Sequence, residues 1–97
     1  MTNAELLERV KLGLQVTNSA FDDVLTLHIN EVKDYIKNAG VSESIVNSEQ
    51  GVGVIFRGVS DLWNNGSGTA TLSPYFRDRV VQLSFLKGDS DVSTTTD

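Results

Sequence analysis

The stretch FDDVLTLHINEVKDYIKNAGV, from Phe21 to Val41, decides the fold because it predicts one long amphipathic helix over about residues 19–39. At 100° per residue its apolar side chains form one stripe and most of its charged side chains the opposite face. Asn18 or Ser19 is expected to cap the helix, and Gly40 to end it in the left-handed conformation. The stripe residues, which should lie on a core, are Phe21, Val24, Leu25, Ile29, Val32, Tyr35, Ile36 and Ala39.

Two residues of this helix depart from the pattern. His28 lies inside the apolar stripe, whereas Leu27 lies on the polar side. Because the chain has one histidine and no cysteine, His28 lacks partners for a metal site or a nucleophilic triad. We expect a partly buried ring that is hydrogen-bonded to a neighbouring backbone or hydroxyl group. Leu27 is either a scattered exposed leucine or a residue that another chain covers.

Three further helices are predicted around the long one. Thr2 and Glu5 have the spacing of a capping box, which starts a helix over about residues 3–14. Helical periodicity predicts another helix over about residues 49–64, and Ser73-Pro74 opens a last one that runs to about residue 87. The expected core residues of these three helices are Leu6, Leu7, Val10, Leu14, Val52, Ile55, Phe56, Val59, Leu62, Trp63, Phe76, Val80 and Leu83. The fold class is therefore all-α, a compact bundle of about four helices in one domain, residues 1–87.

The connecting segments are polar. Residues 41–48 are predicted to be a loop with one helical turn, and residues 64–72 a flexible loop. A β-hairpin competes for the latter because Asn65-Gly66 is a hairpin turn sequence, but the flanking residues do not alternate between apolar and polar. Residues 88–97, GDSDVSTTTD, contain one apolar residue and three acids, so we expect a disordered acidic tail that can order on a partner.

The helix over residues 49–64 contains Gly51, Gly53 and Gly58, each of which costs about 1 kcal/mol of helix propensity relative to alanine. A neighbouring backbone that approaches closely would explain them. That neighbour lies either inside the domain, which we favour, or in another subunit. A phosphate-binding loop is excluded, because the stretch lacks the Gly-Lys-Ser/Thr ending and sits inside a helical period.

The last helix has two apolar faces. Phe76, Val80 and Leu83 share one face, with Leu86 beside them, whereas Val81 and Phe85 lie nearly opposite. Either the domain wraps around this helix or, as we favour, a second chain buries Val81 and Phe85.

The amino-acid composition argues against several classes of function. The net charge of −5 leaves no basic face to neutralise phosphates, which argues against a nucleic-acid binder. The chain has no apolar run of membrane-spanning length, and it carries acids where a secretory signal needs basic residues. The carboxylates lie mostly on solvated helix faces, and no serine occupies a nucleophile elbow. We therefore expect a protein that is not an enzyme, with no catalytic residues, no cofactor and no metal.

Three stretches carry a resemblance to a known family. F-D-D-x-L begins the long helix, whose end is K-N-A-G; D-L-W-N ends the glycine-containing helix, and L-S-P-Y-F opens the last one. Their types and order resemble the small helical head-tail connector proteins of tailed bacteriophages, from about Asn3 to Phe85. These motifs reflect how the helices pack, and the resemblance implies no catalytic residues in this chain.

The resemblance implies a structural adaptor of the virion neck that is made in the host cytoplasm. Copies would form a ring, typically dodecameric, that docks on the portal protein after DNA packaging and extends the DNA channel toward a downstream neck or tail protein. DNA would pass through the lumen without specific binding, and no membrane is involved. The alternative is a small acidic helical module that binds a regulatory partner protein.

Within this hypothesis the exposure pattern nominates two sets of residues. A ring requires two different patches of one subunit to meet on neighbouring copies. The candidate subunit-interface residues are Leu27, Gly51, Gly53, Gly58, Arg77, Arg79, Val81 and Phe85. The candidate partner-docking residues are Asn65, Gly66, Gly68, Gly88, Asp89, Asp91 and Val92.

Overall fold

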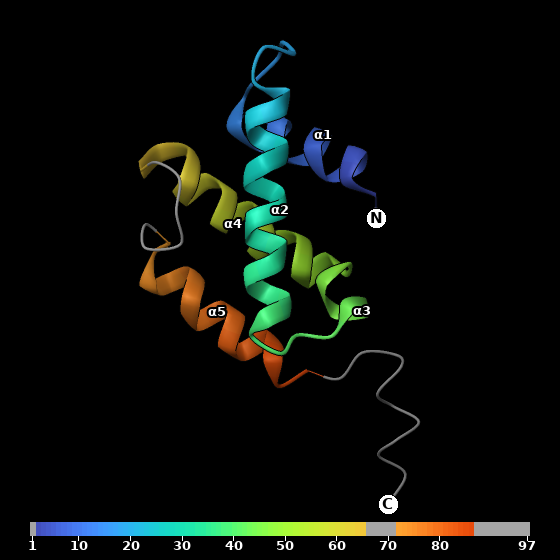
Figure 1. Cartoon of the computed structure of the whole chain (residues 1–97), viewed down its shortest axis with the longest axis vertical. Coiled ribbons are helices and arrows are strands. Elements are labelled where there is room, and N and C mark those ends of the chain that lie inside the picture. The colour runs from blue at the N-terminus through green and yellow to red at the C-terminus, as the bar shows by residue number, and fades with distance from the viewer. Residues whose placement is uncertain (1, 66–71, 87–97) are drawn as a thin grey trace, which may run out of the picture.

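The computed structural model describes residues 2–65 and 72–86, which form five α-helices and no strand (Figure 1). The helices are α1 (Asn3–Leu14), α2 (Asp22–Asn38), α3 (Glu43–Val46), α4 (Glu49–Asn65) and α5 (Pro74–Ser84). α2 crosses the middle of Figure 1, with α1 near its N-terminal half and α3 and α5 near its C-terminal half. The all-α prediction is confirmed, and α3 is the helical turn expected between residues 41 and 48.

α1 has the predicted bounds. The backbone N–H of Glu5 donates to Thr2 Oγ1 at 3.1 Å, and the N–H of Thr2 donates to Glu5 Oε1 at 2.8 Å, which completes the capping box. Leu6 and Val10 are buried, whereas Leu7 and Leu14 pack against the core from partly exposed positions. α1 is therefore attached to the domain through a narrow apolar stripe.

α2 begins later than its sequence predicts. The Oδ1 atom of Asn18 accepts a hydrogen bond from the Ala20 N–H at 2.9 Å, so it is used in a turn before the helix. Phe21 occupies the N-cap position without a side-chain hydrogen bond, and the capping prediction for Asn18 or Ser19 is wrong. The helix ends as expected, because Gly40 has a φ of 96°.

Only the middle of the predicted α2 stripe is buried. Leu25, Ile29, Val32 and Ile36 are at most 1 % exposed. Phe21, Val24 and Ala39, at the two ends of the stripe, are exposed, although the Phe21 ring still contacts Trp63 of α4.

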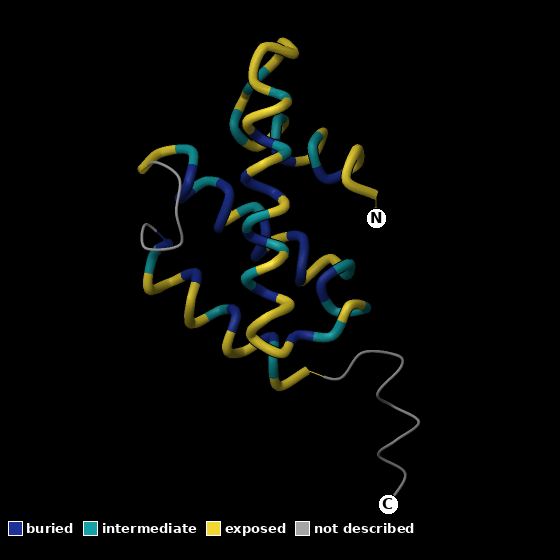
Figure 2. The backbone as a smooth tube through the Cα atoms, in the orientation of Figure 1, coloured by how far each residue is buried: buried dark blue, intermediate teal, exposed yellow. Residues whose placement is uncertain are grey.

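α4 is the central element, since it packs against each of the other four helices. Figure 2 shows the buried segments of the five helices facing a common interior. The buried apolar residues form one cluster, which comprises Leu6, Val10, Leu25, Ile29, Val32, Ile36, Val41, Val46, Val52, Val54, Ile55, Val59, Leu62, Leu72, Phe76, Val80 and Leu83. The other predicted core members of α4, Phe56 and Trp63, are partly buried against this cluster.

α5 is oriented by polar contacts at its start. Ser73 Oγ accepts a hydrogen bond from the Phe76 N–H at 3.1 Å, and Pro74 is the first helical residue, as predicted. Asp61 Oδ2 of α4 accepts a hydrogen bond from the Ser73 N–H at 3.0 Å. The helix ends at Ser84, earlier than the predicted residue 87, which lies outside the described residues.

Two of the three α4 glycines serve internal packing. A Cβ atom on Gly51 would collide with the backbone carbonyl oxygens of Ile45 and Val46, and one on Gly58 would lie 2.6 Å from a Phe76 ring carbon. Around Gly53, by contrast, no atom beyond the adjacent backbone of α4 itself lies within 4 Å of such a Cβ. Close approach inside the domain therefore explains Gly51 and Gly58, but it does not explain Gly53.

This difference yields a matched pair of substitutions. We expect Gly51→Ala to lower the free energy of unfolding by about 1–3 kcal/mol, because its methyl group overpacks the α3–α4 contact. Gly53→Ala should raise it by up to about 1 kcal/mol, because alanine is the better helix former in open space. Urea denaturation followed by circular dichroism measures both values, and equal effects of the two substitutions would contradict the packing explanation.

Candidate subunit-contact surfaces

α5 presents an apolar outer face. Val81 is 55 % exposed and Phe85 is 80 % exposed, whereas the neighbouring Val80 and Leu83 are buried. Arg77, Val81 and Phe85 follow one another at intervals of four residues, so they form one row along the helix. We call this the α5 row. Of the two arrangements expected for the last helix, a domain that wraps around Val81 and Phe85 is wrong for the described residues, because both side chains are exposed.

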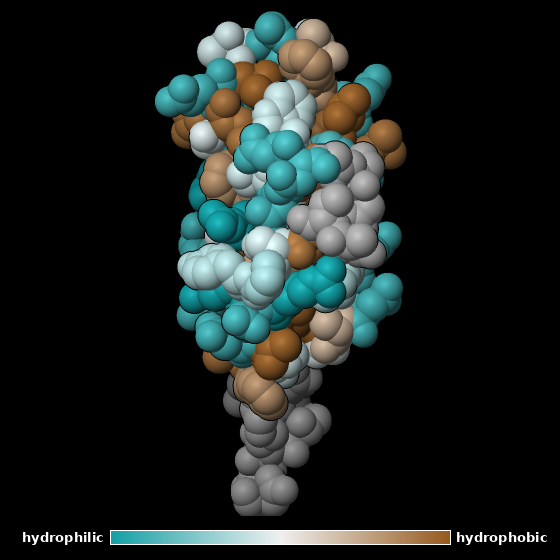
Figure 3. Space-filling model, turned by 90° about the vertical axis from the view of Figure 1, so that its left-hand side faces the viewer, coloured by the Kyte–Doolittle hydropathy of each residue, from teal (hydrophilic) through white to brown (hydrophobic). Residues whose placement is uncertain are grey.

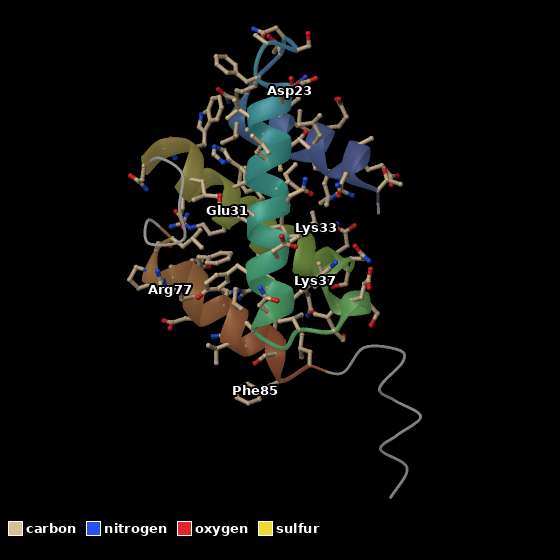
Figure 4. The ribbon with its side chains drawn as sticks, in the orientation of Figure 1. Asp23, Glu31, Lys33, Lys37, Arg77 and Phe85 are labelled. Carbon is tan, nitrogen blue, oxygen red and sulfur yellow. The ribbon has the colours of Figure 1, made fainter. Side chains whose placement is uncertain are left out.

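α2 presents a second exposed face. Leu27 is 68 % exposed, and Asp23 and Glu31 lie four residues before and after it. These three residues form what we call the α2 row. Figure 4 shows Lys33 and Lys37 on the side of α2 toward α1 and α3, and Glu31 on the other side. The α2 row is therefore acidic at both ends, with a leucine at its centre.

The apolar surface is not spread evenly over the molecule. Figure 3 shows apolar residues gathered toward both ends of one face, separated by a hydrophilic belt. Near one end, the rings of Phe21 and Trp63 meet edge to face with centroids 5.2 Å apart. Isolated exposed apolar residues are ordinary, but clustered ones mark contact surfaces.

Three arginines line or border α5. Arg57 Nε lies 4.0 Å from Asp61 Oδ1, and its guanidinium carbon lies 4.9 Å from the centroid of the Tyr75 ring. Arg77 Nε donates to the Leu72 carbonyl oxygen at 3.2 Å. Arg79 borders a shallow groove between α4 and α5, whose other lining residues are Gly53, Val54, Phe56, Arg57 and Tyr75. Arg57 and Arg77 thus also organise the subunit itself.

The predicted interface set needs one correction. Gly51 and Gly58 are buried against other parts of the same chain, so neither offers a surface to a neighbouring subunit. Gly53, Leu27, Arg77, Val81 and Phe85 are exposed, and Arg79 is partly exposed. Among the docking candidates, Asn65 is the exposed last residue of α4, whereas those at positions 66, 68, 88, 89, 91 and 92 lie outside the described residues.

His28 is buried, with 6 % of its surface exposed. Its burial matches the prediction. The expected hydrogen bond to its ring is not found among residues 2–65 and 72–86, so that part of the prediction is wrong for the described chain.

The sequence pattern missed the buried carboxylate of Asp61. It is 8 % exposed and joins α4 to the start of α5 through Ser73. Val54, Gly58 and Asp61 are spaced as i, i+4 and i+7, which places an acid on the buried side of α4. An acid at a core-facing position was the signal that could have identified it.

Two pairs of oppositely charged side chains link α1 to α4 and α2. Arg9 donates two 3.3 Å hydrogen bonds to the Glu49 carboxylate, and these bonds, with the guanidinium charge, lower the pKa of Glu49. The contribution of this pair is therefore present above the unfolded pKa of Glu49 and is lost as the pH falls through its folded pKa. Lys11 Nζ lies 2.8 Å from Asp22 Oδ1, although that oxygen accepts no hydrogen bond from a described residue. Attraction between charges holds this second pair.

The described residues include no group of three or more His, Cys, Asp or Glu side chains placed to hold a metal ion. Over the same ranges, no helix is both long and apolar enough to cross a membrane. Comparisons with protein-family models, curated proteins and solved structures found no match to this chain.

Adjacent valines on α5 test the assignment of its two faces. Val81→Ser should change the free energy of unfolding by less than about 0.5 kcal/mol, because the side chain is already in water. Val80→Ser should lower it by about 2–4 kcal/mol, because it removes a buried apolar group and buries a hydroxyl. Thermal and urea unfolding of the two variants provide the comparison. A large loss of stability in the Val81 variant would place that residue in the core instead.

Proposed function

We propose that this protein is a structural adaptor of the phage virion neck, whose copies form a ring that docks on the portal protein and extends the DNA channel toward the tail. The observation that carries the proposal is a complete apolar core that leaves Leu27, Val81 and Phe85 in water on two different helices. The sequence resemblance to head-tail connectors supports the same function.

The placement of these residues suits a ring. Copies related by rotation about a ring axis meet through two unlike surfaces, one from each neighbour. α2 and α5 each carry an exposed apolar side chain on a face that its own domain does not cover. A subunit with two such faces can bind one copy on each side, which a single self-complementary patch cannot do.

The charge of the chain fits a channel for DNA. The net charge is −5, and Asp23, Glu31 and Asp34 on α2 form no ion pair with a described residue. An acidic wall repels phosphates, so DNA slides past it without adhering. This is the electrostatic property that a passive extension of the channel requires.

Light scattering tests the assembly directly. We expect the purified chain, alone or mixed with a phage portal protein, to form a ring-sized species, and Phe85→Asp to abolish it by burying a charge in the contact. Glu8→Lys, on the exposed side of α1, provides a control that also alters charge. A chain that stays monomeric in both conditions, yet captures a non-structural partner protein, would favour the regulatory module instead.

The acidic tail allows a second test. Deleting residues 88–97 should leave the helical circular dichroism spectrum unchanged, because every helix and every core residue that the structure describes comes before residue 87. We expect the deletion to weaken binding to the portal, since residues 88–97 supply three acids for electrostatic contact with a partner. Co-sedimentation with portal rings measures the change. Unaltered binding would show that the tail has no part in docking.

A further inference from the structure

We propose that the α5 row of one copy packs on the α2 row of the next copy. The proposal rests on the assembly proposed above, and it names the two surfaces that meet. The occupant of each surface is a second copy of this chain. Three features carry the inference: the spacing of the two rows, the position of their apolar side chains, and the opposite signs of their charges.

The two rows have the same geometry. Asp23, Leu27 and Glu31 are spaced by four residues on α2, and Arg77, Val81 and Phe85 are spaced by four residues on α5. Rows of this spacing are the ridges that interdigitate in the commonest class of helix packing, with axes that cross at about −50°. Leu27 of one copy then fits between Val81 and Phe85 of the other, and the three apolar side chains leave water together.

The charges of the rows are complementary. The α2 row carries a carboxylate at each end, and the α5 row carries a guanidinium at one end. With Leu27 seated beside Val81, Arg77 comes next to Asp23 or to Glu31, whichever way the two helices run. Arg77 keeps its bond to the Leu72 carbonyl through Nε, and the positive charge of its guanidinium attracts the carboxylate beside it.

The same charges disfavour the simpler pairings. Two α2 rows placed face to face would bring four carboxylates together, which repel one another. Two α5 rows in a parallel pair would bring their two arginines toward each other. In an antiparallel pair, each arginine would lie away from every carboxylate of the α2 rows. Pairing of an α5 row with an α2 row is therefore the arrangement in which apolar side chains meet apolar ones and opposite charges meet.

Cysteine cross-linking tests this pairing cleanly, because the native chain has no cysteine. Leu27→Cys and Val81→Cys chains, mixed and oxidised, should give a mixed disulfide at least about tenfold faster than the control pair, since contact raises the effective thiol concentration. The control pairs Val81→Cys with Leu12→Cys, whose native leucine is 78 % exposed on α1. A chain with both Leu27→Cys and Val81→Cys should form a ladder longer than a dimer.

The outcomes separate this inference from the proposed function. If the wild-type chain assembles in light scattering but the Leu27/Val81 pair links no faster than the control, the row pairing is wrong and the adaptor proposal stands. If Val81→Cys alone links as fast as the mixed pair, α5 meets α5 and the pairing is again wrong. If wild type never assembles, alone or with portal protein, the adaptor proposal itself fails.

A charge-reversal variant tests the same pairing without introducing a cysteine. Asp23→Arg with Glu31→Arg reverses both carboxylates of the α2 row, one at an exposed and one at a partly exposed position, and should weaken self-association at least about tenfold at low salt. The loss should shrink in 1 M salt, where exposed charges are screened. Self-association equal to that of wild type at low salt would contradict the charge pairing, and an unchanged circular dichroism spectrum excludes misfolding as the cause of any loss.

Discussion

Gly58 has no side chain, and Val32 of α2 and Phe76 of α5 fill the space beside it. Three helices meet at this point, and a Cβ atom there would lie 2.6 Å from Phe76 and 2.8 Å from Val32. The Phe76 ring also contacts Tyr35 of α2, with centroids 5.5 Å apart. Because α5 is drawn close to α4 here, its Phe76–Val80–Leu83 side is fixed inward and its opposite side is fixed outward. The exposure of the α5 row follows from this one close approach.

Polar contacts between α4 and the start of α5 add to the packing at Gly58, and we call them the polar junction. The Asp61 carboxylate accepts a hydrogen bond from the Ser73 backbone N–H, and the Ser73 side chain caps α5. Arg57 lies beside both Asp61 and Tyr75. A buried carboxylate is stable only with such partners. The junction fixes where α5 starts, whereas Gly58 fixes how closely it packs. Together they set the direction in which Val81 and Phe85 face, so the residues of the proposed interface depend on residues that never touch a partner.

Local signals predicted much of this fold, and tertiary contacts explain what they missed. The capping box of α1, the Ser73-Pro74 start of α5 and the exposed positions Leu27, Val81 and Phe85 all follow from short-range spacing. The start of α2 was misplaced because Asn18 can cap a helix or close a turn, and sequence alone does not choose between them. The roles of Gly51, Gly58 and Asp61 depend on residues far along the chain or on another helix. No periodicity could reveal those partners.

The attachment of α1 has a consequence for the order in which the domain opens. Two buried side chains, Leu6 and Val10, hold α1, and Leu7 and Leu14 pack against the core from partly exposed positions. Charged or polar pairs at the edge of α1 add to these contacts, including Arg9 with Glu49 and Lys33 with Asn3. Added salt screens such exposed pairs but leaves the apolar contacts of α2 with α4 intact. Rising ionic strength therefore speeds hydrogen exchange of the α1 amides first, and α1 behaves as a separable unit on a sturdier platform formed by α2, α3, α4 and α5.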